Sequence, residues 1–139
     1  MSLKNKETEA SSFQSRVATW GVAAFGEQMV VETSRSTKSE RNHRFLEEAL
    51  ELVQAAGCSK EEALQLVDYV YGRAVGELEQ EVGGVMICVA MLCFMNDLDM
   101  DAAGEKELTR VWGKIAAIRA KRATKPEFGP LPGFSPPNI

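Results

Sequence analysis

The first 125 residues of the chain contain no proline, because all five prolines lie between Pro126 and Pro137. Proline is the strongest helix breaker, so its absence leaves a long segment free to be helical. Strand signals are also missing, since no stretch alternates apolar and polar residues between turn dipeptides. The sequence therefore predicts an all-α domain over 12–123. We expect a flexible N-terminus over 1–11 and an extended Pro/Gly-rich tail over 124–139.

Other scarcities exclude classes of function. The chain has one histidine, and its three cysteines lack metal-ligand spacing, so we interpret Cys58, Cys88 and Cys93 as reduced core thiols. There is no glycine-rich phosphate loop and no nucleophile motif. The 16 basic residues are outnumbered by 20 acidic ones, for a net charge of −4. This balance gives no reason to expect binding to nucleic acid or to anionic membranes.

Long hydrophobic runs are absent too. The longest uncharged apolar run, Val82–Met95, is too short to span a bilayer and is typical of a buried core helix. The N-terminus, MSLKNKETEA, is polar and carries no signal peptide. We therefore expect a cytoplasmic protein without a membrane partner.

Helical periodicity fills the proline-free segment. Apolar residues recurring every three to four positions predict helices over about 12–31, 40–56, 60–71, 77–96 and from Asp99 or Asp101 to 122. A polar loop is expected over 33–39. Ser59 and Glu62 form a capping box, and Gly72 ends the helix that they start. These helices predict an antiparallel bundle of four main helices and one short helix. Two apolar faces should point inward. The face of the second expected helix consists of Phe45, Ala49, Leu52, Val53 and Ala56. The face of the last expected helix consists of Leu108, Val111, Trp112, Ile115 and Ile118.

Glutamates crowd one side of the second expected helix. Glu51 follows Glu47 by four residues and Glu48 by three, so each of these two pairs is repulsive by roughly 0.2–0.5 kcal/mol. One explanation is a solvated acidic face. Glu77 and Glu81 open the very apolar helix, where the helix dipole favours acids. A second explanation covers both clusters: Mg²⁺, which takes carboxylate oxygens and substrate phosphates as ligands.

These motifs resemble a known superfamily. The E-E-x-x-E in "LEEALEL", a short helix, then "QEVGGVMICVAML" and "NDLDMDAA" resemble the MazG-like all-α nucleoside triphosphate pyrophosphohydrolases over roughly 13–122. Relatives include phosphoribosyl-ATP pyrophosphohydrolase and dimeric dUTPase/dCTPase. The resemblance implies cleavage between the α- and β-phosphates to give a monophosphate and pyrophosphate, with Mg²⁺ or Mn²⁺ as cofactor. It implies a homodimer or homotetramer. It also implies metal ligands at Glu47, Glu48, Glu51 and Glu81, with Glu77 as a further candidate and Glu48 as a catalytic base.

One position departs from the family pattern. Gly84 stands where the family has a ligating aspartate. Either another residue replaces that ligand, or metal affinity is weak, or the fold has lost catalysis. The replacement candidates are Glu77, Asp68, Asn96 and Asp97. The alternative function is therefore a catalytically silenced helical bundle that binds a nucleotide or a partner protein. Gly83 and Gly84 favour close helix packing or room for a ligand, and we expect the apolar helix to contact another subunit near them.

Candidates for substrate binding are fewer. Trp20 is either a core aromatic or a platform for a base. Arg44, Lys114 and Arg119 are candidates for phosphate contacts, although late-helix basic residues equally complement the helix dipole. His43 is a surface or capping residue, or a general base. The sequence does not indicate a preferred base or sugar.

Overall fold

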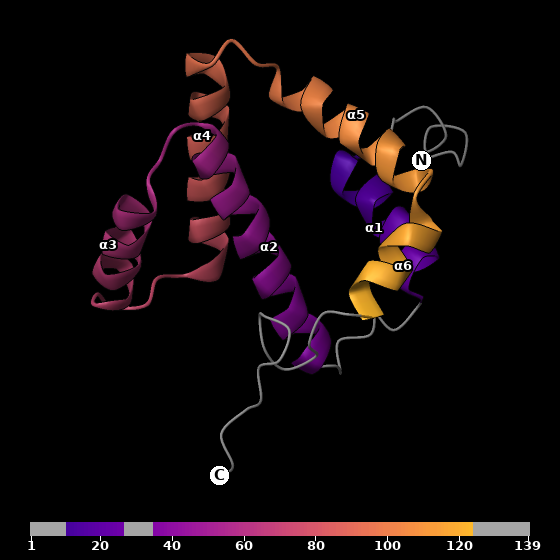
Figure 1. Cartoon of the computed structure of the whole chain (residues 1–139), viewed down its shortest axis with the longest axis horizontal. Helices are drawn as coiled ribbons and strands as arrows, with labels where there is room; N and C mark the ends of the chain where they lie inside the picture. Colours follow the sequence, from indigo (N-terminus) through magenta and orange to yellow (C-terminus); the bar gives the residue numbers. More distant parts are fainter. Residues whose placement is uncertain (1–10, 27–34, 124–139) are drawn as a thin grey trace, which may run out of the picture. The chain divides into compact units, whose positions relative to one another are not determined.

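The structure, a computed structural model, describes residues 11–26 and 35–123, and every regular element in these ranges is a helix. In chain order they are α1 (Phe13–Phe25), α2 (Arg35–Ala55), α3 (Lys60–Tyr71), α4 (Leu78–Met95), α5 (Met100–Trp112) and α6 (Ile115–Ala123) (Figure 1). The predicted all-α class is confirmed. The expectations for the N-terminus before residue 11 and for the tail over 124–139 lie outside the described residues.

The described residues divide into two units. The central unit is Glu40–Ala103, with most of α2 and all of α3 and α4. The terminal unit holds the described residues on either side, with α1, α6 and most of α5.

In the terminal unit, α1 lies alongside α5 and α6 (Figure 1). Ser12 begins α1 by accepting a hydrogen bond from the Ser15 N–H at 3.1 Å. The Phe13 ring covers Gly104, where an added Cβ would lie 3.1 Å from Phe13 Cζ. The buried residues include Ala24 of α1 and Leu108 of α5. Leu108 was predicted to face inward, whereas Trp112 of the same predicted face is 42% exposed.

Two of the predicted helix ends are wrong in this unit. The first helix stops at Phe25 rather than near 31, because Gly26 adopts φ 88° and its N–H bonds the Val22 carbonyl at 2.8 Å. Glycine takes this left-handed conformation without steric cost, and it closes the helix. The predicted last helix is two helices, α5 and α6, separated by Gly113 and Lys114. Gly113 is a weak helix former, and it divides the segment.

The start of the second helix was also predicted wrongly. α2 begins at Arg35, so residues 35–39 of the expected polar loop are helical. This stretch is polar but contains neither glycine nor proline. A polar stretch can therefore stay helical when it contains no helix-breaking residue such as glycine or proline.

In the central unit, α3 has the predicted bounds. Ser59 Oγ accepts a hydrogen bond from the Glu62 N–H at 3.2 Å, as the capping box predicted, and Gly72 follows the last residue. Asp99 caps α5, because its Oδ1 accepts from the Ala102 N–H at 2.9 Å. These helix ends were predicted correctly from capping residues and a terminal glycine in the sequence.

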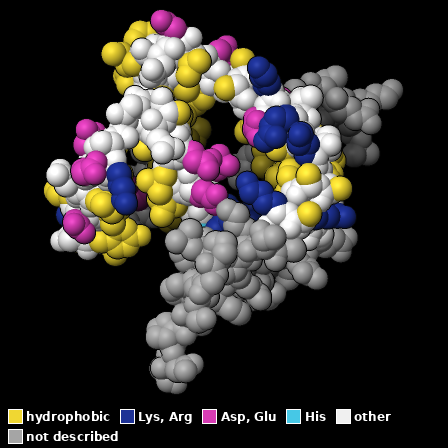
Figure 2. All heavy atoms as spheres, viewed as in Figure 1, with side chains coloured by type: hydrophobic (Ala, Val, Ile, Leu, Met, Phe, Trp, Pro, Cys, Tyr) yellow, Lys and Arg dark blue, Asp and Glu magenta, His cyan; other side chains and the backbone are white. Residues whose placement is uncertain are grey.

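The central unit does not by itself enclose the apolar helix, contrary to the expectation from the sequence. Of α4, only Cys93 is buried, while Phe94 is 75% exposed and Ile87 is 71% exposed. Cys88 is exposed and Cys58 is half-buried, so Cys93 alone is the expected core thiol. Hydrophobic side chains reach the surface over α3 and over the end of α4 that leads to α5 (Figure 2). Among the described helices, α4 has the length and composition that a membrane span requires.

Candidate functional site

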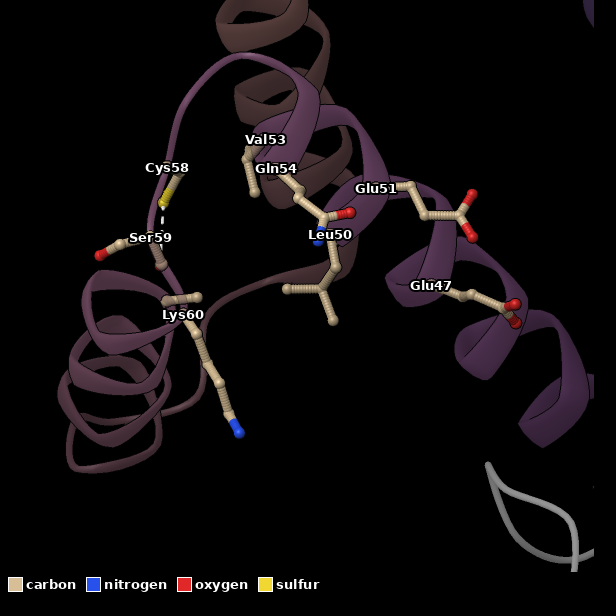
Figure 3. A pocket seen from close by; sticks show the side chains of 9 residues that line it. Glu47, Leu50, Glu51, Val53, Gln54, Cys58, Ser59 and Lys60 are labelled. Atoms are coloured by element: carbon tan, nitrogen blue, oxygen red, sulfur yellow. Dashed lines mark hydrogen bonds between the residues drawn. The ribbon is translucent and has the colours of Figure 1, made fainter.

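Two of the three predicted acids of α2 lie together in the structure. Glu47 and Glu51 are one turn apart, and their carboxylates point to the same side of the helix (Figure 3). Glu48 and Glu51 are exposed, whereas Glu47 is half-buried. Acidic side chains gather at the surface over the middle of α2 (Figure 2). The helix thus places two carboxylates where both can reach a single cation or stay in water.

A cavity of about 340 Å³, here called the acidic cavity, opens beside this cluster. Its lining comes from α2, from the turn after it and from the start of α3 (Figure 3): Glu47, Leu50, Glu51, Val53, Gln54, Cys58, Ser59, Lys60 and Ala63. The Lys60 side chain lies apart from the two carboxylates in Figure 3. The cavity therefore carries both charge signs on different walls, which suits an anionic ligand that brings its own cation.

Part of the acidic charge is compensated within α2. Arg44 Nη1 lies 3.3 Å from Glu47 Oε2, one turn before it on the same helix. The pair is partly screened, since the Glu47 side chain is 36% exposed. Arg44 therefore lies beside Glu47, close enough to contact the phosphate of a ligand whose cation Glu47 would bind.

The acids at the start of α4 occupy a different place. Glu77 is the residue before the helix, and its side chain makes no capping hydrogen bond. The Glu81 carboxylate turns back over Gly76, where an added Cβ would collide with Glu81 Oε1. Gly76 therefore makes the room that this carboxylate occupies. Sequence reasoning did not identify Gly76, because only the folded-back side chain reveals its role.

Glu81 also lines a second cavity of about 450 Å³, here called the apolar cavity, which α2 and α4 share. Its lining is Phe45, Ala49, Leu52, Val53, Glu81, Gly84, Val85, Cys88, Val89 and Leu92. Four of the five residues predicted for the apolar face of α2 are among them, so that face does turn toward α4. Glu81 is the one charged side chain of this lining. The acids of α2 and Glu81 thus border separate cavities.

The two glycines of α4 do not pack closely against anything in the described chain. An added Cβ at Gly83 or at Gly84 would meet no atom within 4 Å. Close packing within the chain, one of the two interpretations of these glycines, is therefore wrong for the described residues. Gly84 borders the apolar cavity, so a side chain at this position would have space.

The described residues do not assemble a complete metal site. Among residues 11–26 and 35–123, no three His, Cys, Asp or Glu side chains lie close enough together to hold a metal ion. Asn96, one candidate for the missing ligand, uses its side-chain amide to cap α4 by donating to the Leu92 carbonyl at 2.8 Å. The described acids fit Mg²⁺ only as a pair, with the remaining oxygens supplied from elsewhere.

The other predicted substrate contacts belong to the terminal unit. Arg119 donates from Nε to the Ala24 carbonyl and from Nη2 to the Ala23 carbonyl, both at 2.6 Å. These bonds satisfy carbonyls at the end of α1, so two donors of this guanidinium are already used. Lys114 is exposed in the break between α5 and α6.

Trp20 is half-buried and packs edge-on against Phe25, with ring centroids 5.6 Å apart. Its Nε1 is buried and has no hydrogen-bond partner among the described residues. This contact agrees with the first predicted role of Trp20, a core aromatic, and its role as a platform for a base stays a prediction.

One thiol faces the acidic cavity. Cys58 Sγ donates to the Ser59 carbonyl at 3.6 Å (Figure 3). Partial burial, and secondarily the nearby Glu62 carboxylate, raise the pKa of the Cys58 thiol above its ordinary 9.0. The Cys58 thiol therefore lines the cavity in its protonated form at neutral pH and is not an activated nucleophile.

Comparison of the chain with protein-family models, with curated proteins and with solved structures finds no match. The resemblance to the pyrophosphohydrolases therefore stays a hypothesis that depends on the residues quoted for it.

Proposed function

We propose that this chain is a Mg²⁺-dependent, MazG-like nucleoside triphosphate pyrophosphohydrolase that releases a nucleoside monophosphate and pyrophosphate. The observation that supports it is the pair of carboxylates, Glu47 and Glu51, pointing to one side of α2 beside an open cavity (Figure 3). Mn²⁺ is a second metal that such oxygen ligands accept. Two carboxylates and a triphosphate together offer the oxygen ligands that Mg²⁺ usually has in nucleotide sites.

The chain's own residues have distinct parts in this proposal. Glu47 and Glu51 would hold the metal that arrives with the nucleotide, and Arg44, which lies 3.3 Å from Glu47, would contact a phosphate oxygen. Glu48 accepts the proton of the water that attacks the α-phosphorus, and the bond from that phosphorus to the bridging oxygen breaks as pyrophosphate leaves. The metal supplies positive charge for the phosphate oxygens. Glu81, which borders the apolar cavity, and Glu77 are further candidates for metal ligands in this proposal.

The finer fold follows from the same proposal. The helices form a four-helix-bundle-like MazG arrangement that becomes complete in a cytoplasmic homodimer or homotetramer. The exposed apolar side chains of α4 support assembly, because a stable soluble chain rarely leaves so many large apolar residues in water.

Pyrophosphate release from a panel of nucleoside triphosphates, with Mg²⁺, with Mn²⁺ and with a chelator, tests the activity. We expect metal-dependent release that falls at least about a hundredfold in Glu51→Gln, the loss typical of a group acting on the reacting phosphate. Glu61→Gln, which changes an exposed glutamate on α3, is the matched control and should be fully active. Equal activities of the two variants would contradict a role for the acidic pair.

A thermal melt separates binding from catalysis. Ligands that bind only the folded state raise the free energy of unfolding by about 2.7 kcal/mol at a hundredfold excess over Kd. We expect Mg²⁺ with a nucleotide to stabilise the wild type more than Mg²⁺ alone, because two carboxylates need the phosphates as co-ligands. Glu51→Gln should lose most of this gain. Without metal it should be slightly more stable, by about 0.2–0.5 kcal/mol, since repulsion is removed.

Gly84 favours a second candidate, a silenced bundle that binds a nucleotide or a partner protein without cleaving it. No described carboxylate takes the place of the family aspartate in a three-ligand group. This candidate predicts stabilisation by nucleotide without pyrophosphate release, with or without metal.

A further inference from the structure

A stripe of α4 on the side away from the apolar cavity is open to solvent. At about 100° per residue, Gly83, Ile87, Ala90 and Phe94 fall in one line, roughly opposite the residues that border the cavity. We call this line the α4 seam. Its spacings of four, three and four residues are those of a coiled-coil contact line. Ile87 is 71% exposed, Phe94 is 75% exposed, and Gly83 has only open space above it.

The α4 seam has a size pattern that is complementary to itself. If a second α4 lies antiparallel, with a two-fold axis level with the peptide between Cys88 and Val89, then Phe94 lies level with Gly83 of the other copy. Ile87 then lies level with Ala90 of the other copy. Each large side chain faces a small one, the arrangement that lets facing layers interdigitate. We infer that the α4 seam binds the α4 seam of a second copy of this chain in this antiparallel register, with Phe94 filling the space over Gly83.

The charges agree with this occupant. No charged residue lies between Glu81 and Asp97, so the whole contact line is neutral. In the antiparallel register Glu79 is level with Leu98, and Glu81 with Asn96, so no carboxylate faces a carboxylate. Antiparallel helices also place opposite ends of their dipoles side by side. A two-fold contact of this kind uses one patch twice and closes at a dimer.

A bilayer fits the same surface less well. The uncharged stretch Val82–Met95 is about 21 Å long as a helix, short of the ~30 Å of a hydrocarbon core. Glu79 and Glu81 lie inside the helix at its first turns. A protein partner covers such a stretch without requiring these carboxylates to enter lipid.

This inference does not depend on the proposed activity, because the seam includes none of the site residues. A dimer formed through the α4 seam would leave the opposite side of α4, which borders the apolar cavity, free of contact with the second copy. An inactive dimer would contradict the enzyme and support the seam. An active monomer would support the activity but contradict both the seam and the assembly proposed with that activity.

Sedimentation equilibrium of the full chain at micromolar concentration tests the inference with four variants. Phe94→Ala removes the large partner, and Gly83→Leu fills the space that Phe94 needs. Each should raise the dimer dissociation constant at least about tenfold, the equivalent of 1.4 kcal/mol. The double variant Gly83→Leu, Phe94→Ala again sets a large residue against a small one and should recover most of the affinity.

Met95→Ala is the matched control, since Met95 is similarly exposed, at 72%, but lies off the seam. It should associate like the wild type. Far-UV circular dichroism should show the same helical signal in all variants, so that lost association is not lost folding. Three results would overturn the inference: a monomeric wild type, including one that binds phosphatidylcholine vesicles; equal weakening by Phe94→Ala and Met95→Ala; or a double variant weaker than both single ones.

Discussion

Arg16 of α1 holds Glu105 of α5 through a two-point ion pair, in which Arg16 Nη1 donates to Glu105 Oε2 at 2.7 Å and Nη2 donates to Oε1. The two residues are 89 positions apart in the chain, so the pair joins distant segments of the terminal unit. It lies next to the Phe13–Gly104 contact. Polar and apolar contacts thus fix α1 against α5 at the same level.

The first prediction concerns the pH dependence of this pair. The hydrogen bonds from Arg16 hold the pKa of Glu105 below its ordinary value of 4.5. A depressed carboxyl pKa means that the stabilising contribution is present above pH 4.5 and is lost as the pH falls through the lowered pKa. Glu105→Gln should therefore lower the melting temperature at neutral pH, and the difference from wild type should shrink as the pH falls below 4.5 and through the lowered pKa of Glu105.

Glu107→Gln is the comparison for that experiment. Arg110 also lowers the pKa of Glu107, but this pair lies within α5 and joins no second helix. Its loss should change the melting temperature less than the loss of Glu105. A larger effect of Glu107→Gln would show that the Arg16–Glu105 pair does not contribute to the packing of α1.

The second prediction contrasts two glycines inside helices. Gly84→Ala should stabilise the chain by about 1 kcal/mol, because alanine is the better helix former and the added Cβ meets open space. Gly104→Ala has the same helix benefit, but its Cβ would press on the Phe13 ring at 3.1 Å. Its gain should be clearly smaller or absent. Urea unfolding of both variants measures the difference, and equal gains would contradict the close contact at Gly104.

The third prediction concerns the thiols. Cys58 has a raised pKa and is half-buried, whereas Cys88 is exposed. Because the thiolate is the reactive form, iodoacetamide at neutral pH should modify Cys88 before Cys58. Buried Cys93 should react last. Mass spectrometry of the peptides against time gives the order, and faster modification of Cys58 would show that its thiol is ionised more easily than its surroundings indicate.

Local signals predicted the parts of the fold that depend on neighbours in the sequence. The Ser59 cap and Gly72 fixed both ends of α3, and the apolar spacing of α2 identified the side that faces α4. The three misplaced boundaries have a different origin. Gly26 ends α1 through a positive φ that spacing does not encode, and Gly113 divides the last predicted helix because glycine is a weak helix former. The polar residues 35–39 were mistaken for a loop although nothing there breaks a helix.

The candidate site was predictable to the same extent. The one-turn spacing of Glu47 and Glu51 placed their carboxylates on one side of α2. The Arg44–Glu47 pair follows the same i,i+3 rule, but the sequence analysis did not predict it. Lys60 and Gly76 were missed. Lys60 reaches the acidic cavity through the turn between α2 and α3, and Gly76 matters only because Glu81 folds back over it. Both depend on tertiary geometry and not on spacing along one helix.

The last prediction uses the open space at Gly84 to decide between the enzyme and its silenced alternative. Gly84→Asp places a carboxylate one turn after Glu81 on the side of α4 that borders the apolar cavity, where an added side chain meets no atom within 4 Å. If the fold is that of the pyrophosphohydrolases, this residue restores the family ligand. Metal-dependent pyrophosphate release should then rise at least about tenfold, a change of ~1.4 kcal/mol in the barrier. Gly84→Asn, which has the same shape without the charge, should leave the rate unchanged.

A silenced bundle would release pyrophosphate only in the Gly84→Asp variant, whereas an active enzyme would already release it as the wild type. If neither the wild type nor Gly84→Asp releases pyrophosphate or is stabilised by Mg²⁺ with a nucleotide, the acids of α2 are a solvated face and the resemblance carries no activity.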